Sequence, residues 1–519
     1  MRCRATAAFL SPDNLPKAEK MNEAPILVLQ MQRMGDLVLS FPLLAGLGRM
    51  FPGHPLIVLG EKAFFEPLLP LSPAAVYFEY GATAGLERQR YHLVLNLSHR
   101  PEAAALAGRL QSECSLGPRS DSAGRLYVDG NWQLYRASLT HNNYYNMYHW
   151  ADLHGLDIFP ARTAPRPGGR SARGFAAGKA GARIGLFLGA SEAAKRPDAV
   201  FWTGLCRRLL EFGHKPVLLG GTAEQGLGLD VAERLRAHAL NLTGRFSVRA
   251  LADFIDSLDL FITPDTGPMH IADYLGVPVL NLSLGPVNPR ETGPFSSGQF
   301  IVQADLECAG CWHCTRPRTE CRDLLTDAGI ALLTRRLLGG AGDAAAAARH
   351  PGEGIKLLRS RRDELGLYDL ENLFPPEDDA RTAAEEAGSG NSRNTRKRCP
   401  AAAAGTAGAR LAPARFWKAW FASIFGLLPQ EAAVEARRRR RASHPGTDAE
   451  LSAAAAAFAL KSVAAFRTRP ELMLDAPDFW QQAPPLLRPF SGYAQMYAQN
   501  CGGTRQAFLD ILSLAETLA

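Results

Sequence analysis

The stretch PDTGPMHIADYLGVPVLNLSLGPVNPRETGPF, residues 264–295, decides the fold of this chain. It continues an apolar run, residues 259–267, that predicts a buried strand ending at Thr263. A helix is predicted to begin at Pro268, because proline is tolerated in the first turn of a helix. Residues 277–285 (VPVLNLSLG) then predict the next strand. Strand, helix and strand in this order predict one unit of a parallel sheet.

The same alternation continues on both sides of this stretch. Continuous apolar runs, typical of parallel strands covered on both faces, occur at residues 25–31, 55–60, 92–98, 183–191 and 215–221. Helices are predicted between them at residues 37–50, 201–212 and 224–239. A stretch rich in Pro, Gly and Arg, residues 163–183, separates two such blocks and predicts a linker. The sequence therefore predicts an α/β fold of two doubly wound, Rossmann-like domains, residues 24–170 and 183–338, facing each other across a cleft.

The ends of the chain differ from these two blocks. Residues 1–23 are predicted to be a disordered extension, with Met21 as an alternative start. Residues 339–415 are rich in Ala, Gly, Ser and charged residues, which predicts a partly disordered linker with a helical piece at 355–370. Residues 416–519 predict a small α-helical C-terminal module with helices at 416–428, 449–466 and 504–518.

The composition bounds the class of protein. The chain has 519 residues, 46% of them hydrophobic and 21% charged, which is typical of a soluble globular protein and excludes fibrous and fully disordered classes. No window reaches the roughly 18 apolar residues that a membrane span needs. Residues 1–20 are a poor signal peptide, because Pro12 and Pro16 break a short apolar run. We therefore predict a cytoplasmic protein.

The turn before the predicted helix at Pro268 has the features of a phosphate site. Free backbone N–H groups and the positive end of the dipole favour an anion at a helix start. Gly267 allows close approach, and His270 lies one step further along the helix, where it can donate a hydrogen bond. The alternative is that Asp265 and Thr266 only cap the helix, which is the commonest use of these residues there.

A second candidate lies in MQRMGDLVLSFPLL, residues 31–44. Gly35 and Asp36 fall where the first strand ends and the first helix begins. Open α/β sheets bind ligands at the carboxyl ends of their strands, so the Asp36 carboxylate is placed to act as a general base. The alternative is an ordinary first-turn acid that stabilises its helix.

Several stretches together carry a resemblance to a known family. They are ILVLQMQRMGDLVLSFPLL (26–44), YHLVLNLSHR (91–100), GASEAAKR (189–196), VLLGGTAEQ (217–225) and residues 241–295. In these motifs, residues 25–338 resemble glycosyltransferase family 9, the heptosyltransferase-type enzymes with the GT-B fold. The resemblance implies an inverting transfer of a sugar, most typically heptose from ADP-heptose, to a lipid-linked acceptor of the lipopolysaccharide-core type. It implies no required cofactor.

The resemblance also implies roles for single residues. Asp36 corresponds to the general base, with Arg33 and Gly35 on the acceptor side. Lys195 corresponds to the lysine that neutralises phosphate charge, and Glu224 to the acid that binds the ribose. The family's diphosphate-binding loop and helix start correspond to Asp265, Thr266, Gly267, Pro268, Met269 and His270. The chain departs from the family pattern at Gln32 and Arg33, Asn96 and Pro197, which bears on sugar and acceptor identity.

Four cysteines form a cluster in the sequence, at Cys308, Cys311, Cys314 and Cys321, with His313 between them. Thiolates at this spacing can share one zinc ion, and three at intervals of two residues are also found in iron–sulfur ligation. The third alternative is free thiols or a local disulfide. Relatives often carry cysteines after the TGPF segment, which implies a structural role.

The C-terminal region carries an aromatic stripe followed by a run of arginines. Phe416, Trp417, Trp420 and Phe421 recur at helical spacing, and Arg437 to Arg441 follow. The favoured interpretation is a helix buried in the C-terminal module with its arginines in solvent. The alternative is an interfacial helix on an anionic membrane, which has the same features and would attach the protein peripherally to the inner membrane.

Two rival functions stay open from the sequence. One is a GT-B enzyme with another donor or acceptor. The other is a non-catalytic scaffold that binds a partner or an anionic surface through the arginine run. No nucleic-acid module is recognisable, so no nucleic acid is expected as a partner.

Overall fold

The computed structural model describes residues 23–140, 142–159, 173–175, 178–236, 238–311, 314, 318–339, 354–374, 406–468, 483–502 and 504–518. The chain divides into two compact units. Unit 1 consists of residues 1–168, 363–367 and 413–519, and unit 2 consists of residues 169–362 and 368–412. Each unit is described by itself.

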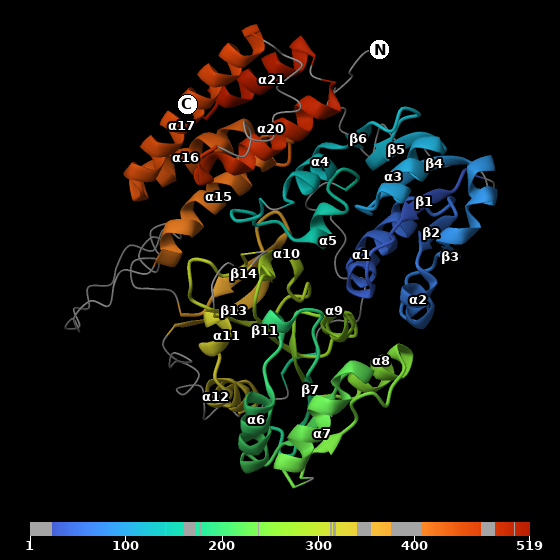
Figure 1. The fold of residues 1–519 in the computed structure, drawn as a ribbon, viewed down its shortest axis with the longest axis vertical. Helices are drawn as coiled ribbons and strands as arrows, with labels where there is room; N and C mark the ends of the chain where they lie inside the picture. Colours follow the sequence, from blue (N-terminus) through green and yellow to red (C-terminus); the bar gives the residue numbers. More distant parts are fainter. Residues whose placement is uncertain are drawn as a thin grey trace. The chain divides into compact units, whose positions relative to one another are not determined.

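Unit 1 contains a six-stranded sheet in the order β3-β2-β1-β4-β5-β6 (Figure 1). Its strands are β1 (Ile26–Leu29), β2 (Leu56–Gly60), β3 (Val76–Glu79), β4 (Arg90–Asn96), β5 (Gln111–Ser120) and β6 (Leu126–Asp129). All neighbours are parallel except β6, which runs antiparallel to β5. Its N-terminal helices are α1 (Met34–Met50), α2 (Lys62–Phe65), α3 (Pro101–Arg109), α4 (Asn131–Ser138) and α5 (Trp150–Leu153). Every residue of β1 is buried, as its continuous apolar sequence predicts for a central strand.

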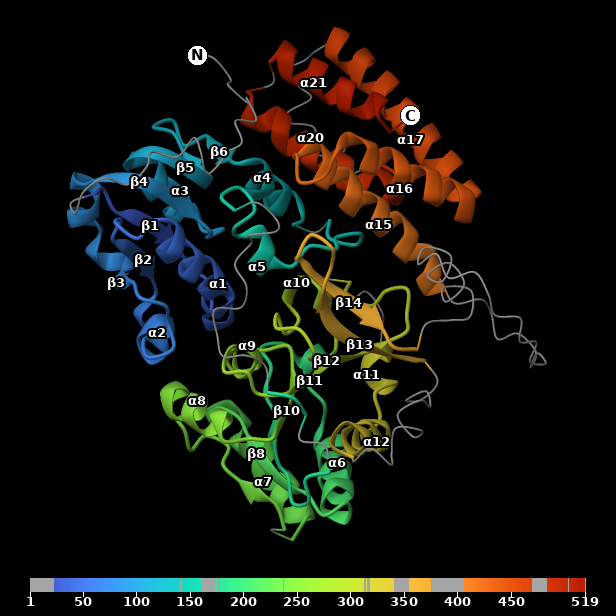
Figure 2. The ribbon, with the colours of Figure 1, turned by 180° about the vertical axis from the view of Figure 1, so that it is seen from behind.

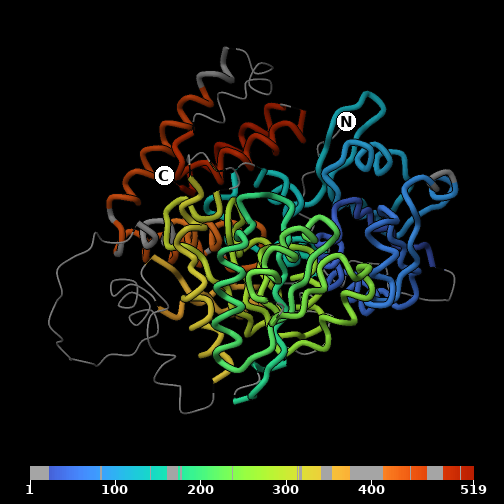
Figure 3. Tube along the Cα trace, turned by 60° about the horizontal axis from the view of Figure 1, so that its bottom comes forward, coloured from blue at the N-terminus to red at the C-terminus, as the bar shows by residue number. Residues whose placement is uncertain are grey.

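The C-terminal helices belong to the same unit. They are α15 (Thr406–Ile424), α16 (Gln430–Ser443), α17 (Pro445–Thr468), α20 (Arg488–Asn500) and α21 (Arg505–Glu516). Helix α17 lies along α16 and α21, and α20 packs against α4 and β6 (Figures 1 and 3). The Asn500 side chain accepts from the Val128 N–H at 2.5 Å and donates to its carbonyl at 2.9 Å. Residues 416–519, expected as a separate module, therefore complete unit 1, because their apolar faces are buried against its helices.

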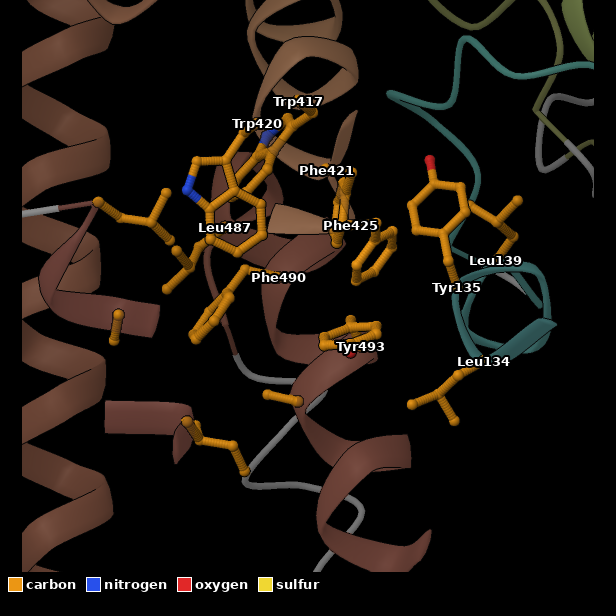
Figure 4. Close-up of a cluster of buried hydrophobic side chains, with 14 of the residues drawn as sticks. Leu134, Tyr135, Leu139, Trp417, Trp420, Phe421, Phe425, Leu487, Phe490 and Tyr493 are labelled. Atoms are coloured by element: carbon orange, nitrogen blue, oxygen red, sulfur yellow. The ribbon is translucent and has the colours of Figure 1, made fainter. Parts of the chain in front are cut away.

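The aromatic stripe of α15 lies inside this shared core (Figure 4). Trp417 and Trp420 are each 1% exposed, and their indole N–H groups donate to Leu486 O and Thr517 Oγ1, both at 3.1 Å. Phe490 of α20 lies 5.9 Å from Trp420 between ring centroids. The interfacial-helix interpretation of this stripe is wrong, because these side chains already pack against protein. Within the described residues, no helix is both long and apolar enough to cross a membrane.

The arginine run lies on α16 and divides between two environments. Arg440 is 2% exposed, ion-pairs with Asp448 and lies over the Phe416 ring at 4.1 Å. The side chains of Arg438 and Arg439 are 83% and 59% exposed and pair with Glu435. Only part of the run therefore faces solvent, and Arg440 is a buried structural cation.

Unit 2 contains an eight-stranded sheet in the order β14-β13-β12-β11-β10-β7-β8-β9 (Figure 2). Its parallel strands are β7 (Arg183–Phe187), β8 (Lys215–Leu219), β9 (Leu240–Asn241), β10 (Leu260–Pro264), β11 (Val279–Ser283) and β12 (Phe300–Ala304). Its α-helices are α6 (Ala199–Glu211), α7 (Gln225–Arg234), α8 (Val248–Asp256), α9 (Gly267–Tyr274), α10 (Pro289–Thr292), α11 (Glu320–Asp323) and α12 (Asp327–Leu338). Two short 3₁₀ helices, η4 (Ala193–Lys195) and η5 (Thr222–Glu224), follow β7 and β8.

The prediction of a helix at residues 355–370 is wrong. These residues form the strands β13 (Ile355–Arg362) and β14 (Tyr368–Asn372), which pair antiparallel and extend the sheet at β12. Apolar and polar residues partly alternate along β13, which suits a strand buried on one face. The Asp363 carboxylate accepts from the N–H groups of Leu365 and Leu367, and Gly366 adopts a φ of +78° in the turn. The stretch predicted as a linker thus contributes an ordered hairpin.

These two sheets confirm the expected fold class, two doubly wound α/β domains of the GT-B type with C-terminal helices. The cleft between the domains stays a prediction. The expected N-terminal extension, most of the expected linker at 163–183 and much of 339–415 lie outside the described residues.

Candidate functional site

In the sheet of unit 1, the order in which strands are added reverses between β1 and β4. From β1 the chain proceeds through β2 to β3 on one side, and from β4 through β5 to β6 on the other. In open parallel sheets such a switch point leaves a crevice at the carboxyl ends of the two strands, where ligands bind. Leu29 at the end of β1 lies opposite Asn96 at the end of β4. The segments that follow these two residues are therefore candidates for a binding site.

The acceptor-side residues expected from the sequence follow β1 directly. Arg33 is the N-cap residue of α1 and is exposed, whereas Gly35 and Asp36 are half-buried in the first turn. Arg33 makes no side-chain cap, and the backbone carbonyl of Asp36 accepts from Gln30 Nε2 at 3.3 Å. Asp36 is thus a first-turn acid and not the cap itself.

Sequence reasoning missed the side chains that contact the segment after β4. The guanidinium of Arg136, on α4, interacts electrostatically with the Asp36 carboxylate. Its Nη1 donates to Leu97 O at 3.0 Å and lies 3.3 Å from His99 Nε2, so it contacts the segment after β4. Trp150 of α5 meets the His99 ring edge-on at 5.9 Å. His99 lies in a quoted motif and could have been found from its place after a strand, but nothing in the sequence pairs it with Arg136.

Asn96, which departs from the family pattern, has a structural role here. It is fully buried, its side-chain nitrogen donates to Pro118 O at 2.6 Å, and its oxygen accepts from Ser98 N at 2.9 Å. The amide needs both a donor and an acceptor to make these bonds, and an ionised aspartate lacks the donor. Asn96 therefore links the ends of β4 and β5 and orients the chain toward His99.

Unit 2 repeats the same topology. The strands β7, β8 and β9 grow to one side and β10, β11 and β12 to the other, so the switch point lies between β7 and β10. Lys195 follows β7, Glu224 follows β8, and the residues from Asp265 to His270 follow β10. The fold thus brings all the expected donor-binding residues to the carboxyl edge of one parallel sheet.

The Glu224 carboxylate packs against the segment that carries Lys195. A Cβ atom at Gly189 would lie 2.7 Å from the Glu224 carboxyl carbon, so a larger residue there would displace the Glu224 carboxylate. One Glu224 oxygen also accepts from the Gly221 N–H at 2.9 Å, which fixes the side chain. Lys195 Nζ lies 3.3 Å from a carboxylate oxygen of Glu192, the residue that precedes the same short helix. Acid and lysine therefore occupy neighbouring loops.

The start of α9 supports the phosphate-site interpretation over the capping alternative. Thr266 is the N-cap residue, but it makes no side-chain cap within the described part of the chain. The Asp265 carboxylate instead accepts from Thr292 Oγ1 at 2.5 Å. A helix start without a side-chain cap keeps N–H groups and a positive dipole end for an anion. Pro268 stands in the first turn as expected.

Two buried side chains of α9 hold this start in place. Burial lowers the pKa of His270, although Asp265, 3.9 Å away, partly opposes the shift, so the imidazole is neutral near pH 7. Met269 is fully buried, and its sulfur lies 2.9 Å from Asn281 Nδ2. Further along α9, the Asp273 carboxylate accepts from the N–H groups of Phe295 and Ser296. These bonds join α9 to the TGPF segment.

The four cysteines lie near one another in unit 2. None of the four forms a disulfide in the described structure. Burial and the neighbouring thiols raise the pKa values of Cys311 and Cys321. Among the residues that the structure describes, which leave out His313, no group of three or more His, Cys, Asp or Glu side chains is arranged to hold a metal.

The cysteine segment contacts the loop after β11. The Gly285 N–H donates to the Cys321 sulfur. Gly285 has a φ of +68°, and a Cβ atom there would lie 3.1 Å from the Ala194 carbonyl, next to Lys195. The thiols are therefore connected to the lysine loop through one glycine.

Comparison with known proteins agrees with these motifs. Residues 82–321 match the family described as Glycosyltransferase family 9 (heptosyltransferase). The chain is 32% identical over 140 residues to a lipooligosaccharide heptosyltransferase 2 of Campylobacter jejuni, covering 26% of this chain and 44% of the relative. It is 32% identical over 145 residues to a lipopolysaccharide heptosyltransferase 1 of Pseudomonas aeruginosa, covering 27% and 40%. The matches thus span less than half the length of these two relatives.

One solved structure that matches this chain is that of the ADP-heptose lipopolysaccharide heptosyltransferase II of E. coli. It matches with a TM-score of 0.46 at 18% identity, over 60% of this chain and 98% of that chain.

Proposed function

We propose that this chain, whose residues 82–321 match glycosyltransferase family 9, is a member of that family and transfers heptose from ADP-heptose to a saccharide of the lipopolysaccharide-core type. One observation carries the proposal. In both units, the residues of the family motifs follow strands that flank the switch point of a doubly wound sheet or, for Glu224, the strand next to it. Such positions are where this architecture binds ligands.

Unit 2 would bind the donor. Departure of ADP places negative charge on the diphosphate while the sugar gains oxocarbenium character. The uncapped start of α9 and Lys195 supply the positive groups that stabilise this charge where it develops. Glu224, fixed by Gly221, would accept hydrogen bonds from the ribose hydroxyls.

Unit 1 would bind the acceptor. The acceptor hydroxyl oxygen attacks the anomeric carbon, the bond from that carbon to the diphosphate oxygen breaks, and ADP leaves with the electron pair. Asp36 takes the hydroxyl proton as general base. Attack on the face opposite the leaving group inverts the anomeric centre.

The direct test is ADP release by the purified chain. ADP-heptose and a heptose-deficient lipopolysaccharide core should together give ADP and an acceptor heavier by one heptose, as measured by mass spectrometry. UDP- and GDP-hexoses are the donor controls. Turnover with one of these donors alone would favour the rival GT-B specificity. No turnover and no nucleotide binding would favour the non-catalytic scaffold.

Replacing Lys195 by alanine should weaken both ADP binding and transfer. A charge-assisted hydrogen bond contributes about 1.5–3 kcal/mol, so we expect ADP affinity to fall about 10- to 100-fold. Isothermal titration with ADP measures this change. Lys215→Ala is the matched control, because Lys215 is exposed at the start of β8, on the opposite edge of the sheet. Equal ADP affinity in both variants would contradict the role of Lys195.

We propose a structural role for the four cysteines, with zinc and iron–sulfur ligation as alternatives to free thiols. The spacing of the four thiols in the sequence is what the two ligation alternatives rest on, whereas the described side chains are not arranged to hold a metal. Cys321 supports the Gly285 loop beside Lys195. We expect Cys321→Ala to lower ADP affinity and thermal stability together, because the Gly285 N–H loses its acceptor. Cys206→Ala, a buried thiol on α6, is the control. ADP affinity unchanged in Cys321→Ala would exclude the supporting role, and elemental analysis of the purified chain distinguishes zinc, iron and free thiols.

We also propose that the protein acts in the cytoplasm, at the inner surface of the membrane that holds its acceptor. The aromatic stripe is unavailable for such contact because it is buried. Arg438 and Arg439, which project from α16, are the side chains that an anionic surface would meet.

A further inference from the structure

Arg136 is a buried cation at the switch point of unit 1. It lies on α4, is 2% exposed, and has hydrogen-bond partners on two elements. Nε donates to Gln133 Oε1 at 3.1 Å within α4, and Nη1 donates to Leu97 O at 3.0 Å just after β4. The guanidinium therefore fixes the direction in which the chain leaves β4.

This guanidinium keeps its charge at neutral pH despite its burial. Burial lowers the pKa of Arg136 to about 10, and the carboxylates of Asp36 and Asp157 oppose that shift. The Asp157 oxygens already accept from the N–H groups of Trp132 and Gln133. The Arg136 charge therefore also acts on the Asp36 carboxylate, which belongs to α1.

Arg136 also selects the form of His99. A guanidinium can only donate, so His99 Nε2, 3.3 Å from Nη1, must accept and carries no proton. Although His99 is exposed at one side, desolvation of its ring against the protein and the Arg136 charge lower its pKa to about 3. The imidazole is therefore neutral, with its proton on Nδ1, where it serves as a hydrogen-bond donor.

We propose that Arg136 is the positioning residue of the acceptor site, holding an ionised Asp36 beside a neutral, Nδ1-protonated His99. The inference rests on the proposed function, because it assigns the proton of the acceptor hydroxyl to Asp36. The hydroxyl would then meet a base and a hydrogen-bond donor whose protonation states are set by one guanidinium. The other titratable groups that act with this set are Asp157, whose charge acts on Arg136, and the buried residues His149 and His154, of which His154 is neutral because burial lowers its pKa.

The test compares two buried arginines of unit 1. Arg136→Met should lower kcat about 10- to 100-fold, the factor expected for lost hydrogen bonds to a charged group, with the KM for donor and the affinity for ADP unchanged. Arg440→Met is the matched control, since Arg440 is also 2% exposed and ion-paired, but with Asp448 in the C-terminal helices. Both variants should unfold at a lower temperature, and only Arg136→Met should lose kcat.

The pH profile gives a second readout that a structural role would not move. Without the adjacent cation, Asp36 binds its proton more readily, and His99 regains a protonation step. The acidic limb of kcat/KM should therefore shift to higher pH in Arg136→Met. In Arg136→Lys the acidic limb should return part of the way to its wild-type pH. Lysine supplies the positive charge but cannot donate hydrogen bonds to both partners as the guanidinium does.

The outcomes separate the inference from the function. If the wild type is active and the two variants Arg136→Met and Arg440→Met have the same kcat and the same acidic limb of the pH profile, the inference is overturned and the function stands. A wild type that releases no ADP in the presence of donor and acceptor would overturn the function, and the inference with it.

Discussion

Asp36→Asn is expected to lower the rate of sugar transfer about 10²- to 10⁴-fold, the contribution typical of a general base. Asparagine keeps the shape of the side chain, so α1 and the contact of Gln30 with the Asp36 backbone should persist. The amide cannot take the proton of the acceptor hydroxyl. ADP affinity should stay unchanged, because the expected nucleotide-binding residues follow strands of unit 2. Single-turnover kinetics and ADP titration measure the two effects.

The control for this variant is another carboxylate of unit 1. Glu87 pairs with Arg109 at 2.9 Å in the segment before β4, and Glu87→Gln should retain full transfer. A rate for Asp36→Asn within threefold of the wild type would reject the general-base role. A loss of ADP affinity equal to the loss of rate would instead assign Asp36 to donor binding.

Trp420→Ala should destabilise unit 1 by about 3–5 kcal/mol, the usual cost of removing a large aromatic side chain from a packed core. Trp420 is 1% exposed and contacts the rings of Trp417, Phe421 and Phe490. Its indole N–H also loses its bond to Thr517. Denaturant titration followed by tryptophan fluorescence measures the free energy of unfolding.

The matched control for this variant is Val434→Ala on α16, where the valine is 69% exposed. Its expected cost is below about 0.5 kcal/mol, as for other surface positions. If α15 were an interfacial helix, Trp420→Ala would leave the stability unchanged and weaken binding to anionic vesicles. That result would contradict the buried core of unit 1.

Much of the fold could be predicted from the sequence because its signals are local. The central strand β1 and the helix α1 fall inside the expected ranges or extend them by a few residues. The hairpin β13–β14 could not be found in this way, because it joins the sheet through β12, far from it in the chain. The edge strand β3, with mostly exposed residues, has no continuous apolar run that would mark it.

The same distinction between local and distant signals applies to the candidate site. Sequence motifs and hydrophobic periodicity can locate the ends of strands. The residues that follow such ends are Asp36, Lys195, Glu224 and Asp265. Arg136 is different, because it acts on the ends of β1 and β4 from a helix that follows both in the chain.

The sequence by itself determined the two doubly wound sheets and the loops that carry the expected donor and acceptor residues. Backbone periodicity and turn chemistry act over a few neighbouring residues, so they can be seen in a single chain. Only the tertiary structure decided that residues 413–519 complete unit 1 and that Arg136 interacts electrostatically with Asp36. Burial of an aromatic stripe and pairing of a buried charge depend on partners distant in sequence, which only folding brings together.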